Sequence, residues 1–225
     1  MHAWIASHGR RLHDRTAAGR ALAAQLTSYV GRPDTLVLAL PRGGVPVAYE
    51  VACSLGAPLD LMLVRKLGLP GQEELAMGAI AEGGVQVLNQ DLVRELRLSP
   101  ELIAHVAASE GHELQRRARL YRGERPPPNL RGKTVILVDD GLATGATMRA
   151  AILAARAQAP ARLIVAAPVA ARETVALLRP LVDELVVVET PEPFGAIGLW
   201  YDEFAQVSDD EVRAILQRPT QRPPT

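Results

Sequence analysis

Two adjacent aspartates, Asp139 and Asp140, directly follow an apolar run of β-forming residues at 135–138. Such a run is typical of a buried parallel strand, so both carboxyl groups are expected at its carboxyl end, where open α/β sheets bind ligands. A Gly- and Thr-rich loop, 141–147, then leads into an alanine-rich helical stretch, and a helix N-terminus favours a phosphate. Paired carboxylates beside a phosphate site suit a phosphorylated sugar, or a Mg²⁺ ion held through water.

A hydrophobic strand that ends in two acids is also found in the Walker B motif of P-loop nucleotidases. This chain has no G-x-x-x-x-G-K-[ST] motif, because the loop around Gly145 contains no lysine, and it has no G-x-G-x-x-G motif. The alternative that stays open is an unrelated nucleotide-binding fold whose strand happens to end in Asp-Asp.

Residues 135–147 resemble the phosphoribosyl-diphosphate (PRPP) signature of the type I phosphoribosyltransferases, in which an apolar strand, paired acids and a Thr-Gly-x-Thr loop follow one another. The resemblance implies that Asp139 and Asp140 hold the ribose 2′ and 3′ hydroxyls. It assigns the 5′-phosphate to the residues of the loop and of the first helical turn: Ala143, Thr144, Gly145, Ala146 and Thr147. It also implies Mg²⁺ as a cofactor that is bound through PRPP and water, with no direct protein ligand.

A second motif, Pro41-Arg42-Gly43-Gly44, stands at the end of the first expected strand. Paired glycines let the backbone approach a ligand closely, and the Arg42 guanidinium offers several donors to a diphosphate. The alternative is an ordinary strand-to-helix turn, which could have the same residues. By its position the motif resembles the family's diphosphate loop, which implies that Arg42, Gly43 and Gly44 bind diphosphate and that the Pro41–Arg42 peptide bond is cis.

Residues 64–71 resemble a stretch of the adenine phosphoribosyltransferases, although the second lysine of that stretch is missing after Gly68. Arg65 and Lys66, at the carboxyl end of an expected core strand, would face the leaving diphosphate and offset its growing negative charge, which makes them the candidate catalytic residues. A solvated Arg-Lys pair at a strand end is the alternative.

Residues 67–89 match the flexible loop that closes over the site in type I enzymes. The acidic residues that serve the purine enzymes are absent, since Ala76 and Ala143 stand at the matching positions. Glu73 and Glu74 are the nearest spare carboxylates. The sequence therefore supports PRPP binding more firmly than it supports a purine acceptor.

Aromatic residues gather after the last expected strand, among them Phe194, Trp200 and Tyr201. These rings could stack on a planar base, or they could dock the C-terminal segment onto its own core. The arginines of the run 116–122 are expected on a solvated helix face.

The expected elements alternate between strands and helices, which is typical of a parallel sheet covered on both faces. The strands are expected at 35–41, 59–66, 133–138, 162–169 and 184–190, and a hairpin is expected around Gly83-Gly84. Helices are expected at 10–29, 45–55, 99–122, 147–158 and 171–179. The fold class is α/β: a five-stranded parallel sheet flanked by helices, as in the type I phosphoribosyltransferase fold, with a small hood. A single domain, 1–225, is expected, with its core at about 30–190, hood elements from 1–29 and 191–217, and a frayed tail at 218–225.

The chain has 225 residues, a formal net charge of zero and one cysteine. A neutral chain gives no support to broad attraction to nucleic acid or anionic membranes. The start of the chain has no apolar segment of a signal peptide, and no stretch approaches membrane-spanning length. We expect a cytoplasmic homodimer whose ligands are PRPP and an acceptor.

The resemblance implies an enzyme that transfers a 5-phosphoribosyl group from PRPP to a nitrogen nucleophile, either a nucleobase or a small amine, with release of diphosphate. The missing acidic residues keep open a second hypothesis, a regulatory protein that senses PRPP without useful catalysis.

Overall fold

A five-stranded parallel sheet forms the centre of the protein, in the strand order β2-β1-β6-β7-β8. The computed structural model describes residues 11–220, without the side chains of Glu73 and Glu74. The strands are β1 (Thr35–Ala39), β2 (Leu59–Leu61), β6 (Thr134–Val138), β7 (Arg162–Val169) and β8 (Glu184–Glu189). The expected fold class is therefore confirmed.

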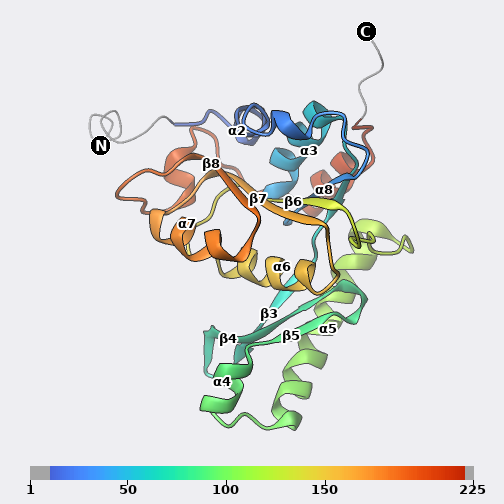
Figure 1. Ribbon diagram of the computed structural model, residues 1–225, viewed down its shortest axis with the longest axis vertical. Coiled ribbons are helices and arrows are strands. Elements are labelled where there is room, and N and C mark those ends of the chain that lie inside the picture. The colour runs from blue at the N-terminus through green and yellow to red at the C-terminus, as the bar shows by residue number, and fades with distance from the viewer. Residues whose placement is uncertain (1–10, 221–225) are drawn as a thin grey trace.

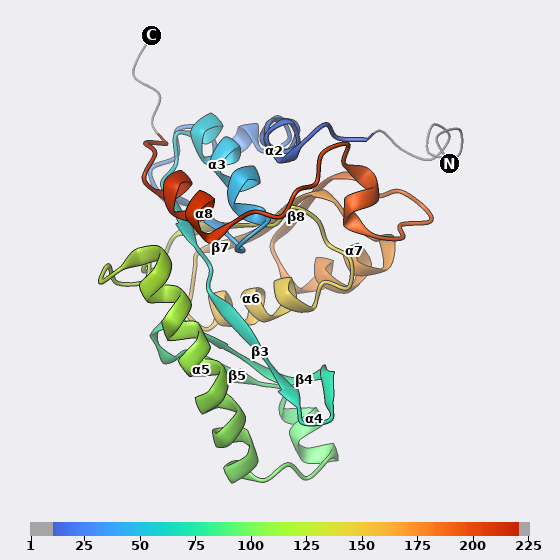
Figure 2. The ribbon, with the colours of Figure 1, turned by 180° about the vertical axis from the view of Figure 1, so that it is seen from behind.

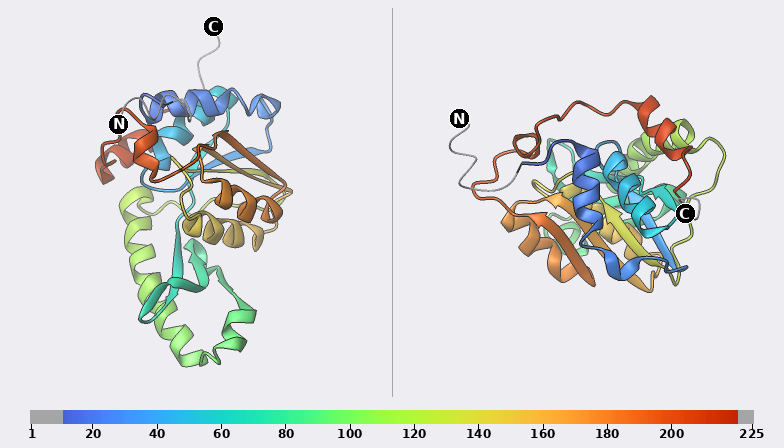
Figure 3. Two further views of the ribbon diagram at one scale, coloured as in Figure 1. Left: turned by 90° about the vertical axis from the view of Figure 1, so that its left-hand side faces the viewer. Right: turned by 90° about the horizontal axis from the view of Figure 1, so that it is seen from above.

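Helices cover both faces of this sheet (Figures 1 and 3). One layer contains α2 (Arg15–Ala23), α3 (Gly44–Leu55) and α8 (Asp209–Leu216), and the other contains α6 (Ala146–Arg156) and α7 (Arg172–Leu178). Alternate strand residues serve the two layers: Ile136 and Val138 belong to the first core cluster, whereas Val135 and Leu137 belong to the second. Burial on both faces explains why these strands are continuous apolar runs in the sequence.

The direction of the chain across the sheet reverses between β1 and β6. From β1 the chain passes through α3 to β2 on one side, and from β6 it passes through α6 to β7 on the other. Such a reversal opens a crevice at the carboxyl ends of the two strands, which is the usual ligand site in doubly wound sheets. The motifs at 41–44 and 139–147 both begin at this crevice.

A second, antiparallel sheet lies beside the α6 layer and projects from the core (Figures 1 and 2). It consists of β3 (Val64–Leu69), β4 (Gln72–Ala81) and β5 (Gln86–Leu88), and it packs with α4 (Gln90–Glu95) and α5 (Pro100–Arg122). We call residues 64–122 the hairpin subdomain. The expected hairpin around Gly83-Gly84 is confirmed, and the Ser99 side chain caps α5 by accepting a hydrogen bond from the Leu102 N–H.

The expected single strand at 59–66 is wrong, because β2 ends at Leu61 and β3 belongs to the other sheet. Met62 and Leu63, which are buried, form the crossing between the two sheets. The range 30–190, which was expected to form the core, therefore contains two parts, because residues 64–122 form the hairpin subdomain.

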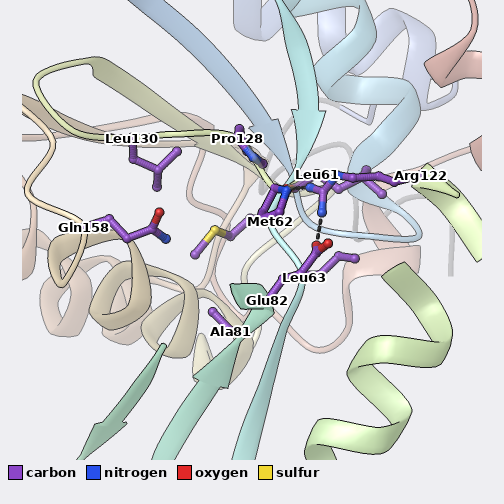
Figure 4. Close-up of a pocket in the computed structure, with 10 residues that line it drawn as sticks. Leu61, Met62, Leu63, Ala81, Glu82, Arg122, Pro128, Leu130 and Gln158 are labelled. Atoms are coloured by element: carbon purple, nitrogen blue, oxygen red, sulfur yellow. Dashed lines mark hydrogen bonds and ion pairs between the residues drawn. The ribbon is translucent and has the colours of Figure 1, made fainter. Parts of the chain in front are cut away.

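Arg122 at the end of α5 anchors the hairpin subdomain to the core (Figure 4). Its side chain is 2% exposed, and its Nε donates to Asp60 Oδ1 at 2.8 Å. It also donates to the Leu61 carbonyl and pairs with Glu82. The expectation of a solvated arginine face is therefore wrong for this residue, since two carboxylates compensate its buried charge, whereas Arg116 and Arg119 are exposed.

Short 3-10 helices complete the fold: η1 (Thr27–Tyr29), η2 (Glu82–Gly84), η3 (Arg179–Leu181) and η4 (Ile197–Trp200). The segment after β8, which includes η4 and α8, runs back beside α2, and a bridge between Leu12 and Tyr201 joins it to the residues that precede α2. Among residues 11–220, no helix is both long enough and apolar enough to cross a membrane.

Candidate functional site

The loop between β6 and α6 surrounds a pocket of about 160 Å³, which we call the cradle. Asp139 forms one side of it, and Ile197 from η4 lies at another. All five residues predicted to bind the 5′-phosphate line the cradle: Ala143, Thr144, Gly145, Ala146 and Thr147. The first amides of α6, an eleven-residue helix, lie at this pocket, so an anion there meets donors that lack intrahelical partners.

Contacts with the next strand and helix hold the cradle loop. The Leu142 N–H donates to the Val169 carbonyl at 2.9 Å, and the Leu142 carbonyl accepts from the Ala171 N–H at 2.9 Å. The Thr174 hydroxyl donates to the Ala143 carbonyl. Gly145 has a φ of 71° and a Cβ there would lie 2.6 Å from Thr174 Cγ2, so both the backbone conformation and the packing require glycine.

The two aspartates occupy different environments. Asp139 is partly exposed and lines the cradle, and its Oδ1 accepts a hydrogen bond from the Asp140 N–H at 2.9 Å. The Asp140 side chain is 11% exposed, and its Oδ2 accepts from Arg15 Nε at 2.8 Å. The Tyr201 hydroxyl donates to the Asp140 carbonyl at 2.6 Å. Asp139 is therefore the acid that lines the cradle, while Arg15 and Tyr201 bind Asp140.

Burial raises the pKa of Asp139 well above the usual aspartate value, and the nearby charge of Asp140 raises it further. Burial also raises the pKa of Asp140, but the Arg15 guanidinium opposes that rise. The two carboxyl groups therefore differ in that the Arg15 guanidinium compensates mainly the charge of Asp140.

The Arg42-Gly43-Gly44 loop packs directly against these aspartates. A Cβ at Gly43 would lie 2.0 Å from Asp140 Oδ2, and a Cβ at Gly44 would lie 2.7 Å from the Val138 carbonyl oxygen. The Pro41–Arg42 peptide bond is cis, as the resemblance implied. The Arg42 side chain lies toward α8, with Nη1 3.7 Å from Asp209 Oδ1. The two loops predicted from the sequence thus meet at one crevice.

A profile of the phosphoribosyl transferase domain matches residues 9–195. The chain belongs to this family. A relative from Mycobacterium tuberculosis, named "Putative phosphoribosyl transferase" in two strains, is 49% identical over 205 residues, which are 91% of this chain and 46% of that protein. The chain spans about half the length of the curated relatives that it matches. The crystal structure of TT1426 from Thermus thermophilus is 44% identical, with a TM-score of 0.85 over 92% of this chain and 97% of that one.

For this phosphoribosyl transferase domain, the expectation that Arg65 and Lys66 lie at the carboxyl end of a core strand is wrong. They are neighbours on β3, so their side chains point to opposite faces of the second sheet. Arg65 pairs with Glu110 of α5 at 2.6 Å, whereas Lys66 borders a second pocket together with Thr144, Gly145 and Ala146. Only Lys66 of this pair is therefore directed toward the cradle loop.

The predicted stacking role of the C-terminal aromatic residues is wrong for Trp200 and Tyr201. Their exposed fractions are 2% and 1%, and Trp200 Nε1 donates to the Phe194 carbonyl at 2.8 Å. Phe194 packs partly buried against the same cluster. The rings therefore dock the C-terminal segment onto the core, which was the alternative interpretation.

Two site residues escaped the sequence analysis. Arg15 binds Asp140, donates to the Ala205 carbonyl at 2.7 Å, and lies 4.0 Å from the centre of the Phe204 ring. Ile197 borders the cradle, and a Cβ at Gly141 would lie 2.6 Å from its Cγ2. Neither residue carries a local motif, and both are far from the cradle loop in the sequence.

Proposed function

We propose that this domain binds PRPP in the crevice and transfers its 5-phosphoribosyl group to a nitrogen nucleophile. A bond forms between that nitrogen and C1 of the ribose, and the bond from C1 to the diphosphate oxygen breaks, so that diphosphate leaves with the electron pair. The observation that carries the proposal is the meeting of the cradle, Asp139 and the Gly43-Gly44 turn at the switch point of the sheet.

In this proposal the amides of residues 143–147 hold the 5′-phosphate, and Asp139 accepts hydrogen bonds from the ribose hydroxyls. Asp140 keeps its Oδ2 on Arg15, so its other oxygen is the one available to a hydroxyl. Arg15 is a positioning residue, because it acts through Asp140. By holding the sugar in one orientation, these groups would use binding energy to position C1 for the attack.

The diphosphate would lie against the Arg42-Gly43-Gly44 turn, with the Gly43 amide as its backbone donor, because the Gly44 N–H donates to the Leu40 carbonyl at 3.1 Å. The Arg42 guanidinium would be released from Asp209 to reach it. Lys66 would approach the substrate phosphates from the hairpin subdomain and stabilise the leaving group. Arg65 is neutralised by Glu110, so it supports β3 while Lys66 interacts with substrate. Mg²⁺, bound by PRPP oxygens and by water in contact with Asp139, would neutralise the diphosphate charge.

A PRPP sensor without catalysis is the second candidate. Asp139 is the one acidic side chain among the described residues that line the cradle, and Ala76 and Ala143 fill the positions where the purine enzymes carry acids. A sensor needs a PRPP site and a change in the hairpin subdomain, but no group to accept a proton from an acceptor.

Two measurements on the same preparation test the proposal. Calorimetric titration with PRPP and Mg²⁺ reports binding, and a panel of nucleobases and small amines is screened for PRPP-dependent release of diphosphate. Binding together with release supports the enzyme, and binding without release for every acceptor supports the sensor. Absence of PRPP binding would overturn both.

We further propose that the domain is a cytoplasmic homodimer that has PRPP and its acceptor as ligands. Light scattering on the purified chain tests the oligomeric state, since a monomer at micromolar concentration contradicts it.

A further inference from the structure

A second pocket, of about 240 Å³, lies between α6 and the hairpin subdomain. We call it the α6 cleft. It is larger than the cradle, and residues 144–146 border both spaces. Its other described walls come from β3, β4, the start of α4, the outer side of α6 and α7. Apart from Lys66 and residues 144–146, the residues of its walls have no role in the proposed transfer.

Apolar side chains form much of the α6 cleft. Leu75 from β4 is 37% exposed and Leu177 from α7 is 48% exposed, and both border the cleft. Leu92 and Leu153 lie deeper and are partly buried. Large apolar side chains that meet at the mouth of one pocket favour a ligand that removes them from water.

The polar side chains that line the cleft are two cations, an amide and the Thr144 hydroxyl. Lys66 and Arg149 both line it, and among the described residues of its walls none is acidic. The Asn89 side-chain oxygen accepts from the Leu92 N–H at 3.3 Å and caps α4, which leaves its amide nitrogen as the donor for the cleft. Cations on apolar walls suit a ligand with one anionic head.

We propose that the α6 cleft is a ligand site separate from the PRPP cradle, and that it takes a small carboxylate with an apolar or aromatic body. The planar guanidinium of Arg149 matches the two oxygens of a carboxylate, and the Leu75–Leu177 mouth covers the body of the ligand. The volume equals roughly eight waters at about 30 Å³ each, which is room for a bicyclic aromatic acid. The inference goes beyond the proposed function and does not depend on it.

The test uses 1-naphthoate as the probe and neutral 1-naphthylmethanol as its uncharged counterpart, each titrated calorimetrically into the full chain. Arg149→Ala should weaken naphthoate binding about tenfold, because a charge-assisted hydrogen bond is lost, and should leave the alcohol unaffected. Leu177→Asn should weaken both probes severalfold. The matched controls are Arg156→Ala, about two turns further along α6, and Leu199→Asn, whose side chain is 49% exposed outside the cleft.

Saturating PRPP should leave naphthoate bound, and Asp139→Asn should weaken PRPP binding about 100-fold while naphthoate binds as before. The proposal is overturned if 1-naphthoate does not bind at millimolar concentration, if Arg149→Ala and Leu177→Asn bind it as tightly as the controls, or if PRPP displaces it. Failure of PRPP binding alone would contradict the proposed function and leave the α6 cleft supported.

Discussion

The core sheet and the hairpin subdomain present their charged residues in different ways. Every residue of β1 and β6 is buried, and their chemistry begins where these strands end. β3, by contrast, is mostly half-buried and carries Arg65 and Lys66 in mid-strand on opposite faces. The groups proposed to hold the ligand therefore follow the fully buried strands, while the candidate leaving-group cation lies on the less buried strand.

The largest effect is expected where the two regions join. Arg122→Met removes the partner of Asp60 and Glu82 and leaves two partly buried carboxylates uncompensated. The free energy of unfolding should fall by about 3–5 kcal/mol in urea titrations. Arg119→Met, on the exposed side of the same helix, should change it by less than about 0.5 kcal/mol. Equal effects would mean that the ion pairs of Arg122 do not anchor the subdomain.

Lys66→Ala tests whether the hairpin subdomain contributes to the chemistry. If an acceptor is found, the activation free energy of the transfer step should rise by about 2–4 kcal/mol. This corresponds to a fall in kcat of roughly 30- to 1000-fold, with a smaller change in PRPP affinity. The reason is that the leaving diphosphate gains negative charge as the C1–O bond breaks. Single-turnover kinetics on the saturated enzyme measure this step. Severe loss of PRPP binding with unchanged turnover would contradict the leaving-group role.

Asp139→Asn tests the core side of the comparison. PRPP affinity should drop about 100-fold, because an amide accepts hydrogen bonds from ribose hydroxyls less well than a carboxylate does. Calorimetry with PRPP and Mg²⁺ measures it, and Asp202→Asn, half-exposed beside Arg11, is the control. Asp140→Asn should also weaken binding, by less, since one oxygen of Asp140 is held by Arg15. Unchanged affinity in both site variants would remove the central assignment.

The same Asp139→Asn substitution should stabilise the protein at neutral pH. Burial raises the pKa of Asp139, so the native state binds more protons at this group than the unfolded chain does. Its contribution to stability therefore falls as the pH rises from the ordinary aspartate pKa through the raised one. The advantage of the variant in urea unfolding should therefore grow with pH over the interval between these two pKa values. A difference that shrinks over this range would contradict the sign.

The smallest expected effect on stability is found in a comparison of two glycine-to-alanine substitutions, one in each region. Gly111→Ala, inside α5, meets no heavy atom closer than Ile80 Cδ1 at 3.6 Å and should stabilise the fold by about 0.5–1 kcal/mol. Gly43→Ala should instead displace Asp140 and weaken PRPP binding, because the added Cβ overlaps its carboxylate. Thermal unfolding and PRPP titration of both variants measure the contrast.

The sequence predicted the parts of the site that are continuous along the chain. Residues 139–147 form a strand end, a loop and a helix start, so their arrangement follows from local rules. The order of strands and helices likewise follows from apolar runs and capping residues. The Gly43-Gly44 turn was found because paired glycines at a strand end indicate a close approach of the backbone, and both glycines pack closely against the segment 138–140.

The parts that the sequence could not predict depend on distant partners. Arg15 reaches Asp140 across 125 residues, and Glu110 reaches Arg65 across 45. An aromatic cluster looks the same whether it stacks on a ligand or packs into a core, and the burial of Trp200 and Tyr201 decides between the two. The stretch 59–66, which was expected to form one strand, likewise has no local signal that it divides between two sheets.

The hairpin subdomain is one uninterrupted insertion between consecutive strands of the core sheet, because β6 is the next core strand after β2. The chain enters it at Met62-Leu63 and returns through Arg122 and Pro128, and these segments border one small cavity of about 20 Å³ (Figure 4). Because the insertion begins and ends at the same place, a single junction connects it to the core sheet. Replacement of the insertion at that junction would change what lies beside the cradle loop, while the cradle loop and the Gly43-Gly44 turn stay as they are.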